Sequence, residues 1–254
     1  MVFDTRVYLC GRVTVERGGR VVTGSALGGR QGRLLFAFLG TRRTHPIGKG
    51  QLTDAIWGAH PPPSADTAIN ALVSKVRAAL RRVGVAKPYG VESDGGSYGF
   101  AGVSAWVDVD AAANAIDCAE GAVRAGAPRD AWAPANVAAT IARQPFLPDE
   151  ERPWIAAQRV HLQRVWRRAV LVLSVVSVSN GEHQLGIQYA SEALSAEPYD
   201  ETACQALMRA QVAAGNRAEA LRVYAGCRKL FRDELGAEPS DQTKAVFLSV
   251  LRGE

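Results

Sequence analysis

One segment, residues 64–83, constrains the fold of this chain more than any other. Its sequence, SADTAINALVSKVRAALRRV, places apolar side chains on one face of an α-helix and polar ones on the opposite face. The apolar face holds Ile69, Leu72, Val73, Val76, Leu80 and Val83, and the polar face holds Thr67, Asn70, Ser74, Arg77 and Arg81. Such a helix packs on a core and presents a basic surface to a polar partner. An ordinary solvated helix is the alternative interpretation.

The flanking segments predict a compact motif around this helix. Residues 52–58 form a short amphipathic helix closed by glycine, and three prolines at 61–63 prevent helix until Ser64, which can act as N-cap. Downstream, YGVESDGGSYGF contains two β-prone pieces around Asp94-Gly95-Gly96, whose residues supply the positive φ angles of a tight hairpin turn. The order of helix, turn, basic helix and hairpin is that of a winged helix-turn-helix.

The first part of the chain predicts a small sheet and one more helix. Residues 6–27 alternate apolar and polar side chains around Gly18-Gly19, as in a β-hairpin or a small antiparallel sheet. Helical spacing of the apolar residues from Arg30 to about Arg43 predicts a helix that covers this sheet.

Basic charge is concentrated in the same part. Residues 1–100 contain fourteen Lys and Arg against six Asp and Glu, whereas the remainder contains sixteen against nineteen. This segregation is expected if the N-terminal part contacts phosphates.

Several ordered motifs identify a resemblance to a known family. LGGRQGRLLFAFL, then Ile56-Trp57-Gly58, PPPSADTAINALVSKVRAALRRVG and SYGF are similar to the N-terminal domain of the Streptomyces antibiotic regulatory protein family. AGNRAEALRVYAGCRKLFRDELGAEPS resembles the family's second half, the bacterial transcriptional activation domain. The resemblance implies an OmpR-type winged helix followed by that domain.

An internal repeat predicts the fold of the second half. Gly181 and Gly215 lie 34 residues apart, and the same offset pairs Leu173 with Leu207, Gly186 with Ala220, Ala190 with Tyr224 and Ala193 with Cys227. This period, with small residues at helix crossings, is typical of tetratricopeptide repeats. We expect an all-α domain from about Val107 to Leu251, in which Pro128, Pro134, Pro145, Pro148 and Pro153 interrupt the first helices.

The predicted organisation is therefore an α+β winged helix-turn-helix domain, residues 1–102, followed by an all-α tetratricopeptide-like domain, residues 107–254. The short segment AGVSAWV between them is interpreted as the link of a closely coupled pair.

Candidate DNA contacts follow from the exposed helix face. Thr67, Asn70 and Ser74 form the stripe that faces the major groove, and Asn70 is the best candidate for a base edge because its amide both donates and accepts. Lys75 and Arg77 flank the stripe and are expected to reach bases or phosphates, and Arg81 and Arg82 to meet the backbone. In the hairpin, Ser97 and Tyr98 are expected to touch phosphate or the minor groove, although Gly99 stands where OmpR-type wings often carry a cation. Arg30, Gln31 and Lys49 lie near predicted helix starts and can hold a phosphate there, with a merely solvated side chain as the alternative.

Other classes of protein find little support. The four cysteines are far apart and are expected to be buried, reduced thiols, and the four histidines lack metal-ligand spacing. Gly48-Lys49-Gly50 lacks the rest of a phosphate-binding loop, and no nucleophile elbow occurs. We therefore expect no catalytic residue, metal or cofactor. No signal peptide or membrane span is predicted, which indicates a cytoplasmic protein that does not bind membranes.

The residues predict a sequence-specific regulator of transcription. The family resemblance implies an activator that binds direct repeats in double-stranded DNA, self-associates there, recruits RNA polymerase through its sigma factor and controls secondary-metabolite genes. Larger family members add nucleotide-hydrolysing or phosphopeptide-binding modules, and because the sequence ends at Glu254 we expect no control by such a module in cis. The alternative is a tetratricopeptide-type scaffold or sensor whose groove takes a peptide or small molecule, and repression instead of activation stays open.

Overall fold

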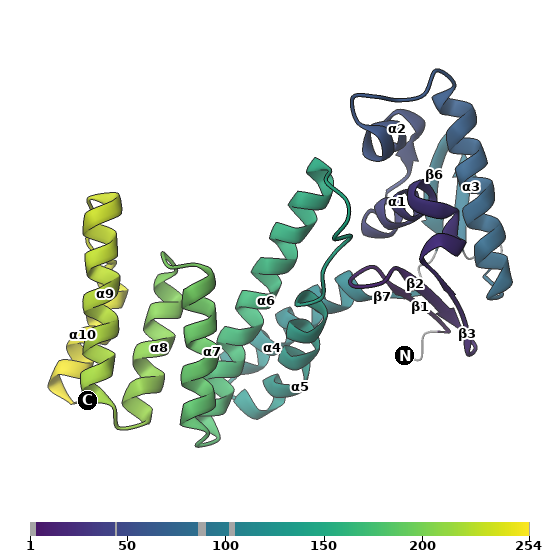
Figure 1. Ribbon diagram of the computed structural model, residues 1–254. Helices are drawn as coiled ribbons and strands as arrows, with labels where there is room; N and C mark the ends of the chain where they lie inside the picture. Colours follow the sequence, from purple (N-terminus) through teal and green to yellow (C-terminus); the bar gives the residue numbers. More distant parts are fainter. Residues whose placement is uncertain (1–3, 44, 86–89, 102–104, 254) are drawn as a thin grey trace. The chain divides into compact units, whose positions relative to one another are not determined.

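The computed structural model describes residues 4–43, 45–85, 90–101 and 105–253 (Figure 1). The chain divides into two compact units, Met1–Ala111 with Ile141–Leu162, and Ala112–Thr140 with Gln163–Glu254. Each unit is described by itself. These units do not test the predicted domain boundaries, residues 1–102 and 107–254, which stay a prediction.

The first unit begins with a sheet whose strand order is β3-β2-β1-β7. Its first three strands are antiparallel: β1 (Thr5–Tyr8), β2 (Thr14–Arg17) and β3 (Arg20–Thr23). Gly18 and Gly19 connect β2 to β3 with φ angles of 53° and 75°, a conformation that glycine adopts at no steric cost. The predicted small sheet is confirmed.

The fourth strand of this sheet corrects the expectation for the segment between the predicted domains. β7 (Ala105–Val107) does not act as a link but pairs with β1 in parallel. The side chain of Val107 is buried, and the ring of Trp106 meets that of Tyr8 edge to face at 5.3 Å between centroids. The burial of Val107 and the edge-to-face contact of Trp106 explain why so short an apolar segment adds a strand.

Asp108 fixes the end of this strand. Its carboxylate, 2% exposed, accepts hydrogen bonds from the backbone N–H groups of Leu9, Cys10 and Val109, each 2.8 Å long. These bonds tie the beginning of α4 (Asp108–Arg124) to the end of β1.

Three α-helices follow the first sheet in the same unit. After the 3-10 helix η1 (Gly24–Leu27) come α1 (Gly29–Thr41), α2 (Lys49–Trp57) and α3 (Ala65–Arg82). All three helices were predicted at these places, although Ser64 precedes α3 without a side-chain capping bond. α1 is buried from Leu34 to Gly40 because it packs mainly against α2, α3 and η1 instead of covering the first sheet as predicted.

A second sheet completes the core of this unit. β4 (Ile47–Gly48), β5 (Gly90–Asp94) and β6 (Ser97–Ala101) have the order β4-β6-β5. β5 and β6 form the predicted hairpin, with Gly95 and Gly96 at φ 54° and 86° in its turn. The ring of Phe100 in β6 meets that of Phe36 in α1 edge to face at 5.5 Å, so the hairpin is attached to the helices by a buried aromatic pair.

Residues 141–162 also belong to the first unit. The indole nitrogen of Trp154 donates to the carbonyl of Ala55 at 3.0 Å, and Arg152 donates to the carbonyl of Ile56 at 2.9 Å. Trp154 packs its ring edge to face on Phe38 at 5.1 Å. These contacts satisfy carbonyls at the C-terminal end of α2, which have no partner within the helix.

The second unit is entirely helical in the residues described. It contains parts of α4, α5 (Pro128–Ala142) and α6 (Pro153–Ser179), followed by α7 (His183–Ala196), α8 (Glu201–Ala213), α9 (Arg217–Leu235) and α10 (Asp241–Arg252). Pro128 and Pro153 begin helices, but Pro134 lies inside α5, so its predicted interruption is wrong. The carbonyl left without a donor belongs to Asp130, an exposed residue in the first turn, where water can replace the missing N–H.

The 34-residue offset coincides with the helix boundaries. α7 and α9 begin at His183 and Arg217, and Gly181 and Gly215 precede them with φ angles of 81° and 78°. Gly186 lies at a helix crossing, since a Cβ there would be 2.7 Å from Val178 Cγ2. Small residues at this period therefore permit the close approach of neighbouring helices.

One hydrophobic cluster of this unit gathers around the last three helices. Its buried members include Cys204, Met208, Tyr224, Cys227 and Phe231. The rings of Tyr224 and Phe247 stack with centroids 4.0 Å apart. Cys10, Cys204 and Cys227 are buried free thiols as predicted, whereas Cys118 is exposed, which corrects the expectation for that residue. Among the described helices, none combines the length and hydrophobicity needed to cross a membrane.

Candidate nucleic-acid interface

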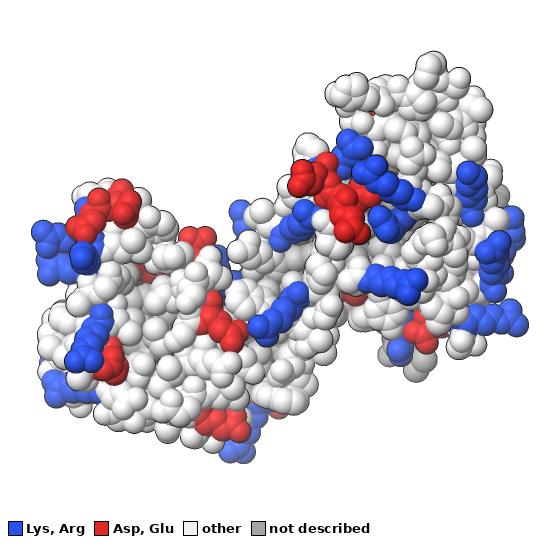
Figure 2. Space-filling view, in the orientation of Figure 1, with Lys and Arg blue, Asp and Glu red and all other residues white. Residues whose placement is uncertain are grey.

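The exposed face of α3 carries most of the predicted contact residues. Thr67, Asn70, Ser74, Lys75, Arg81 and Arg82 are exposed, and the predicted apolar face, with Ile69, Leu72, Val73, Val76 and Leu80, is buried. The separation of the two faces is therefore confirmed. Figure 2 shows Lys and Arg side chains along the edge of the first unit where α3 lies.

Asn70 accepts one hydrogen bond on its side chain and one on its backbone carbonyl, and the first of these orients its amide. The hydroxyl of Tyr98 in β6 donates to Asn70 Oδ1 at 2.6 Å, and the hydroxyl of Ser74 donates to the Asn70 carbonyl at 2.9 Å. Asn70 Nδ2 makes no hydrogen bond within the described residues. The two amide donors of Asn70 are thus available on the exposed face, and Ser74 is partly committed to the helix backbone.

The position of Tyr98 differs from the expectation that it touches phosphate or the minor groove. Tyr98 is 6% exposed. Its side chain points from β6 toward α3, where its hydroxyl reaches Asn70. Ser97 stays half-exposed beside the turn. β5 and β6 contain no Lys or Arg, and a Cβ on Gly99 would meet nothing within 4 Å. The described hairpin therefore offers polar groups and no cation.

Arg77 has a structural partner instead of a free guanidinium. Its Nε donates to the carbonyl of Val91 at 2.8 Å, and its Nη2 donates to the hydroxyl of Ser93 at 3.2 Å. Arg77 thereby joins α3 to β5. These bonds occupy two of the five N–H donors of the guanidinium, and the expectation that Arg77 reaches bases or phosphates stays a prediction.

Lys75, Arg81 and Arg82 are the free cations of the face. None of them makes a hydrogen bond or ion pair with another residue in the described part of the chain, and all three are exposed. Arg81 and Arg82 lie in the last turn of α3, where the helix dipole favours positive charge.

The cations at the other helix starts already have partners. Arg30, next to the first residue of α1, forms a bidentate pair with Glu150 at 2.7 and 2.8 Å, and Arg33 contacts the same carboxylate at 3.3 Å. Lys49 begins α2 and lies 3.7 Å from Asp66. Gln31 is exposed. Arg30 and Gln31 lie together in the first turn of α1. This turn lies close to Lys75 of α3, since a Cβ at Gly28 would be 3.2 Å from the Cβ of Lys75.

Glu150 is an acid whose titration is controlled by these arginines. Its side chain is 1% exposed. Burial raises the pKa of this carboxyl, but the hydrogen bonds and positive charges of Arg30 and Arg33 lower it further, so the net pKa lies below the ordinary value. The pair is a structural contact. Arg30 can bind a phosphate only if its guanidinium donates to Glu150 and to the phosphate at the same time.

Two features of the candidate sites were not predicted. The sequence contains no local signal that Tyr98 supports Asn70, since the two residues are 28 positions apart. The second unit also contains a cavity lined by α4, α6 and α8, which a helical period cannot locate. In the described part, no cluster of three or more His, Cys, Asp or Glu side chains could hold a metal ion.

Comparisons with known proteins connect this architecture to regulators of transcription. Residues 107–251 match the family described as the bacterial transcriptional activator domain. Regulatory protein AfsR of Streptomyces coelicolor (strain ATCC BAA-471 / A3(2) / M145) is 30% identical over 251 residues, which are 98% of this chain and 24% of AfsR. Regulatory protein AfsR of Streptomyces griseus is 27% identical over 250 residues, 98% of this chain and 25% of that protein. The chain thus spans about a quarter of the length of these curated relatives.

A solved structure shares the fold. Mycobacterium tuberculosis EmbR in complex with a low-affinity phosphopeptide superimposes with a TM-score of 0.88 and 21% sequence identity, over 99% of this chain and 66% of that chain. A small N-terminal region with strands and a helical body are common to both. Together these findings confirm the resemblance that the sequence motifs indicate.

Proposed function

The chain belongs to the bacterial transcriptional activator domain family, and from this premise we propose that it activates transcription by binding DNA directly. One observation carries the proposal: α3 buries its apolar side and exposes a stripe of hydrogen-bonding groups flanked by unpaired cations. A surface of this kind suits a helix that enters the major groove.

We propose that residues 1–102 form an OmpR-type winged helix. Three features support this assignment: the order α1, α2, α3 and hairpin, the short β4 strand that pairs with β6, and the position of the hairpin next to α3. α3 is the recognition helix, and the β5–β6 hairpin is the wing.

The residues at the centre of the stripe recognise the bases. Thr67 and Asn70 present polar groups without a competing charge, and the free amide donors of Asn70 suit an acceptor such as N7 or O6 of a purine in the major groove. Lys75, Arg81 and Arg82 contact phosphates on the flanks, where each neutralised phosphate releases counterions. Arg77 and Tyr98 act as positioning residues for this surface.

For residues 107–254 we propose a tetratricopeptide-like activation domain. The equal spacing of α7 and α9 and the small side chains at their crossings support it. This domain contributes contacts to RNA polymerase and its sigma factor and to a second copy of the chain. Two copies then bind adjacent direct repeats at promoters of secondary-metabolite genes, and the protein acts in the cytoplasm without a metal or a catalytic step.

Selection from random duplex DNA tests this function. The whole chain, the double variant Asn70→Ala/Arg81→Ala and the control Arg129→Ala would be carried through several rounds in parallel at about 0.1 M salt. Arg129 is an exposed arginine of α5, outside the candidate interface. We expect the wild type and the control to enrich a spaced direct repeat and the double variant to enrich none. Absence of any enriched sequence with the wild type would refute sequence-specific DNA binding.

A further inference from the structure

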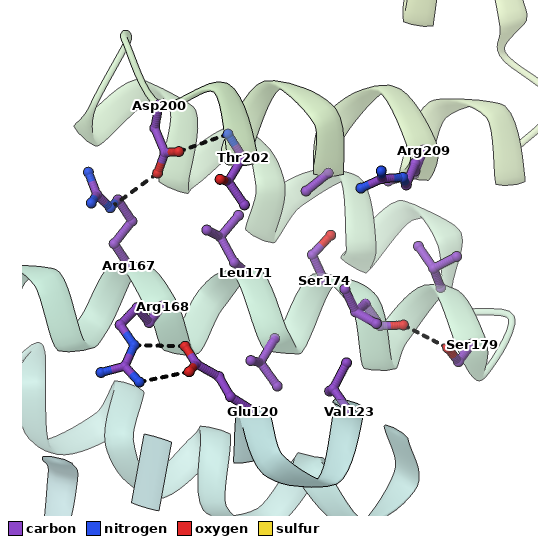
Figure 3. Close-up of a pocket in the computed structure, with 15 residues that line it drawn as sticks. Glu120, Val123, Arg167, Arg168, Leu171, Ser174, Ser179, Asp200, Thr202 and Arg209 are labelled. Atoms are coloured by element: carbon purple, nitrogen blue, oxygen red, sulfur yellow. Dashed lines mark hydrogen bonds and ion pairs between the residues drawn. The ribbon is translucent and has the colours of Figure 1, made fainter. Parts of the chain in front are cut away.

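The second unit contains a cavity that the proposed DNA-binding function does not use. Its volume is about 480 Å³, and its walls come from α4, α6 and α8 (Figure 3). Cavities of about 300–1,000 Å³ are typical of sites for small molecules. The lining residues all belong to one unit, so the site is complete within it.

The floor of the cavity is apolar and partly open to solvent. Leu171, Val175 and Val178 recur on one face of α6, and Val123 of α4 and Ala206 of α8 face the same space. The side chain of Val175 is 41% exposed. An exposed valine at the base of a hollow leaves apolar surface in contact with water, and a ligand with an apolar body would cover it.

Two ion pairs lie at one end of the cavity. Arg168 binds both carboxylate oxygens of Glu120 at 2.7 and 2.8 Å, and Arg167 lies 3.2 Å from the carboxylate of Asp200 (Figure 3). Asp200 also caps α8 by accepting from the N–H of Thr202 at 2.9 Å. These charges are therefore already neutralised and do not call for a charged ligand.

Arg209 differs from these residues because its guanidinium has no partner. It projects from α8 over the cavity (Figure 3), is exposed, and makes no hydrogen bond or ion pair with any residue that the structure describes. The hydroxyl of Thr202, two helical turns earlier on the same face, is likewise without a partner there. The cavity thus combines an apolar floor with one uncompensated positive charge.

We propose that this cavity binds a small amphipathic carboxylic acid. The apolar body of the acid covers Leu171, Val175 and Val178, and its carboxylate accepts a bidentate hydrogen bond from Arg209. The volume fits a small molecule better than a folded partner, and the apolar lining disfavours inorganic phosphate or another fully hydrated anion. The site therefore gives this regulator a place for an acidic effector, independent of the DNA surface.

Binding of a fluorescent fatty acid tests this assignment on the whole chain without DNA. Dansylated undecanoic acid is the probe, its methyl ester is the neutral comparison, and straight-chain carboxylic acids of increasing length are competitors. We expect saturable binding of the acid and at least about tenfold weaker binding of the ester, because the ester lacks the charge that Arg209 pairs.

Variants locate the probe in the cavity. Arg209→Gln is expected to weaken binding of the acid about tenfold, whereas Arg129→Gln, an exposed arginine of α5 outside the cavity, leaves it unchanged. Val175→Asp places a negative charge on the floor and should abolish binding, while circular dichroism and the thermal midpoint show that the variant is folded.

Three outcomes would overturn the proposal. They are no saturation by the acid below about 1 mM, equal affinity for acid and ester, and unchanged affinity in Arg209→Gln. If binding is lost in Val175→Asp but unchanged in Arg209→Gln, the cavity takes a neutral apolar ligand or a peptide side chain instead of an acid. DNA selection with the same Arg209→Gln protein remains a separate measurement, so failure of the effector site and failure of DNA binding are distinguishable.

Discussion

The hydroxyl of Tyr98 donates a 2.6 Å hydrogen bond to Asn70 Oδ1 and so joins the β5–β6 hairpin to the exposed face of α3. The ring of Tyr98 is buried, which fixes the direction of its hydroxyl. Since the oxygen of Asn70 has this partner, its amide nitrogen is turned toward the outside of the helix. In the DNA complex proposed above, the hairpin would act on base recognition through this buried residue.

Tyr98→Phe should therefore reduce the specificity of DNA binding. The variant keeps the aromatic ring but loses the bond that orients Asn70, and a net hydrogen bond is worth about 1 kcal/mol, or roughly fivefold in affinity. We expect affinity for the selected repeat to fall by about this factor while affinity for a scrambled duplex stays constant. Fluorescence anisotropy with both duplexes measures the ratio.

Tyr8→Phe is the matched control, because Tyr8 lies in the first sheet and its hydroxyl contacts Glu16 at 3.4 Å. An unchanged ratio of specific to scrambled affinity in Tyr98→Phe would show that the orientation of Asn70 does not matter for recognition.

Arg77 and Arg81 should respond differently to the same substitution. Arg77→Gln removes bonds to Val91 and Ser93 and should lower the free energy of unfolding by about 1 kcal/mol. Arg81→Gln should leave stability within about 0.5 kcal/mol but reduce the slope of log K against log salt by about 1, because one phosphate contact is lost. Urea unfolding and salt titrations separate the effects. Equal loss of salt slope with unchanged stability in Arg77→Gln would contradict its role as a positioning residue.

Helical and hairpin periodicity was sufficient to predict much of the fold. The amphipathic pattern of α3 and the Gly-Gly turns of the two hairpins are local, so each is visible within a short window of sequence. The pairing of β7 with β1 was missed because it joins residues 105 and 5, and no local pattern encodes a parallel partner so distant. Pro134 was misjudged because its cost depends on the exposure of one carbonyl, which only the packing of α5 determines.

The candidate site was predictable as a face but not as a set of contacts. Periodicity placed Asn70, Lys75 and Arg81 on the outside of α3, and the structure agrees. It could not predict that Arg77 donates to β5 or that Arg30 pairs with Glu150, 120 positions away. The partner of a long side chain depends on which groups lie near it in the folded structure. A helical projection of the sequence does not contain this information.

Glu150 should make the stability of the first unit dependent on acid pH. The pKa of this carboxyl is lower in the folded state than its ordinary value, so the folded chain binds its proton less readily than the unfolded chain does. The stabilisation is therefore complete above the ordinary pKa of about 4.3 and is lost as pH falls through the lower folded value. Glu150→Gln should lower the free energy of unfolding by about 2 kcal/mol at neutral pH and by less below about pH 4.

Urea unfolding of wild type and variant at both pH values measures this difference. Glu151→Gln is the control, since Glu151 is exposed and makes no hydrogen bond or ion pair within the described residues. A loss of stability in Glu150→Gln that is the same at both pH values would mean that the ion pairs with Arg30 and Arg33 do not set its pKa.

Two glycines of the second unit should respond in opposite directions to alanine. At Gly186 a Cβ would lie 2.7 Å from Val178 Cγ2 and 3.2 Å from the carbonyl oxygen of Ser174, so Gly186→Ala forces α6 and α7 apart and should cost about 1–3 kcal/mol. At Gly226, inside α9, a Cβ would meet nothing within 4 Å, and Gly226→Ala should stabilise the helix by up to about 1 kcal/mol. Thermal unfolding followed by circular dichroism compares the two variants. A stabilised Gly186→Ala protein would show that the close approach of α6 and α7 is not required by the fold.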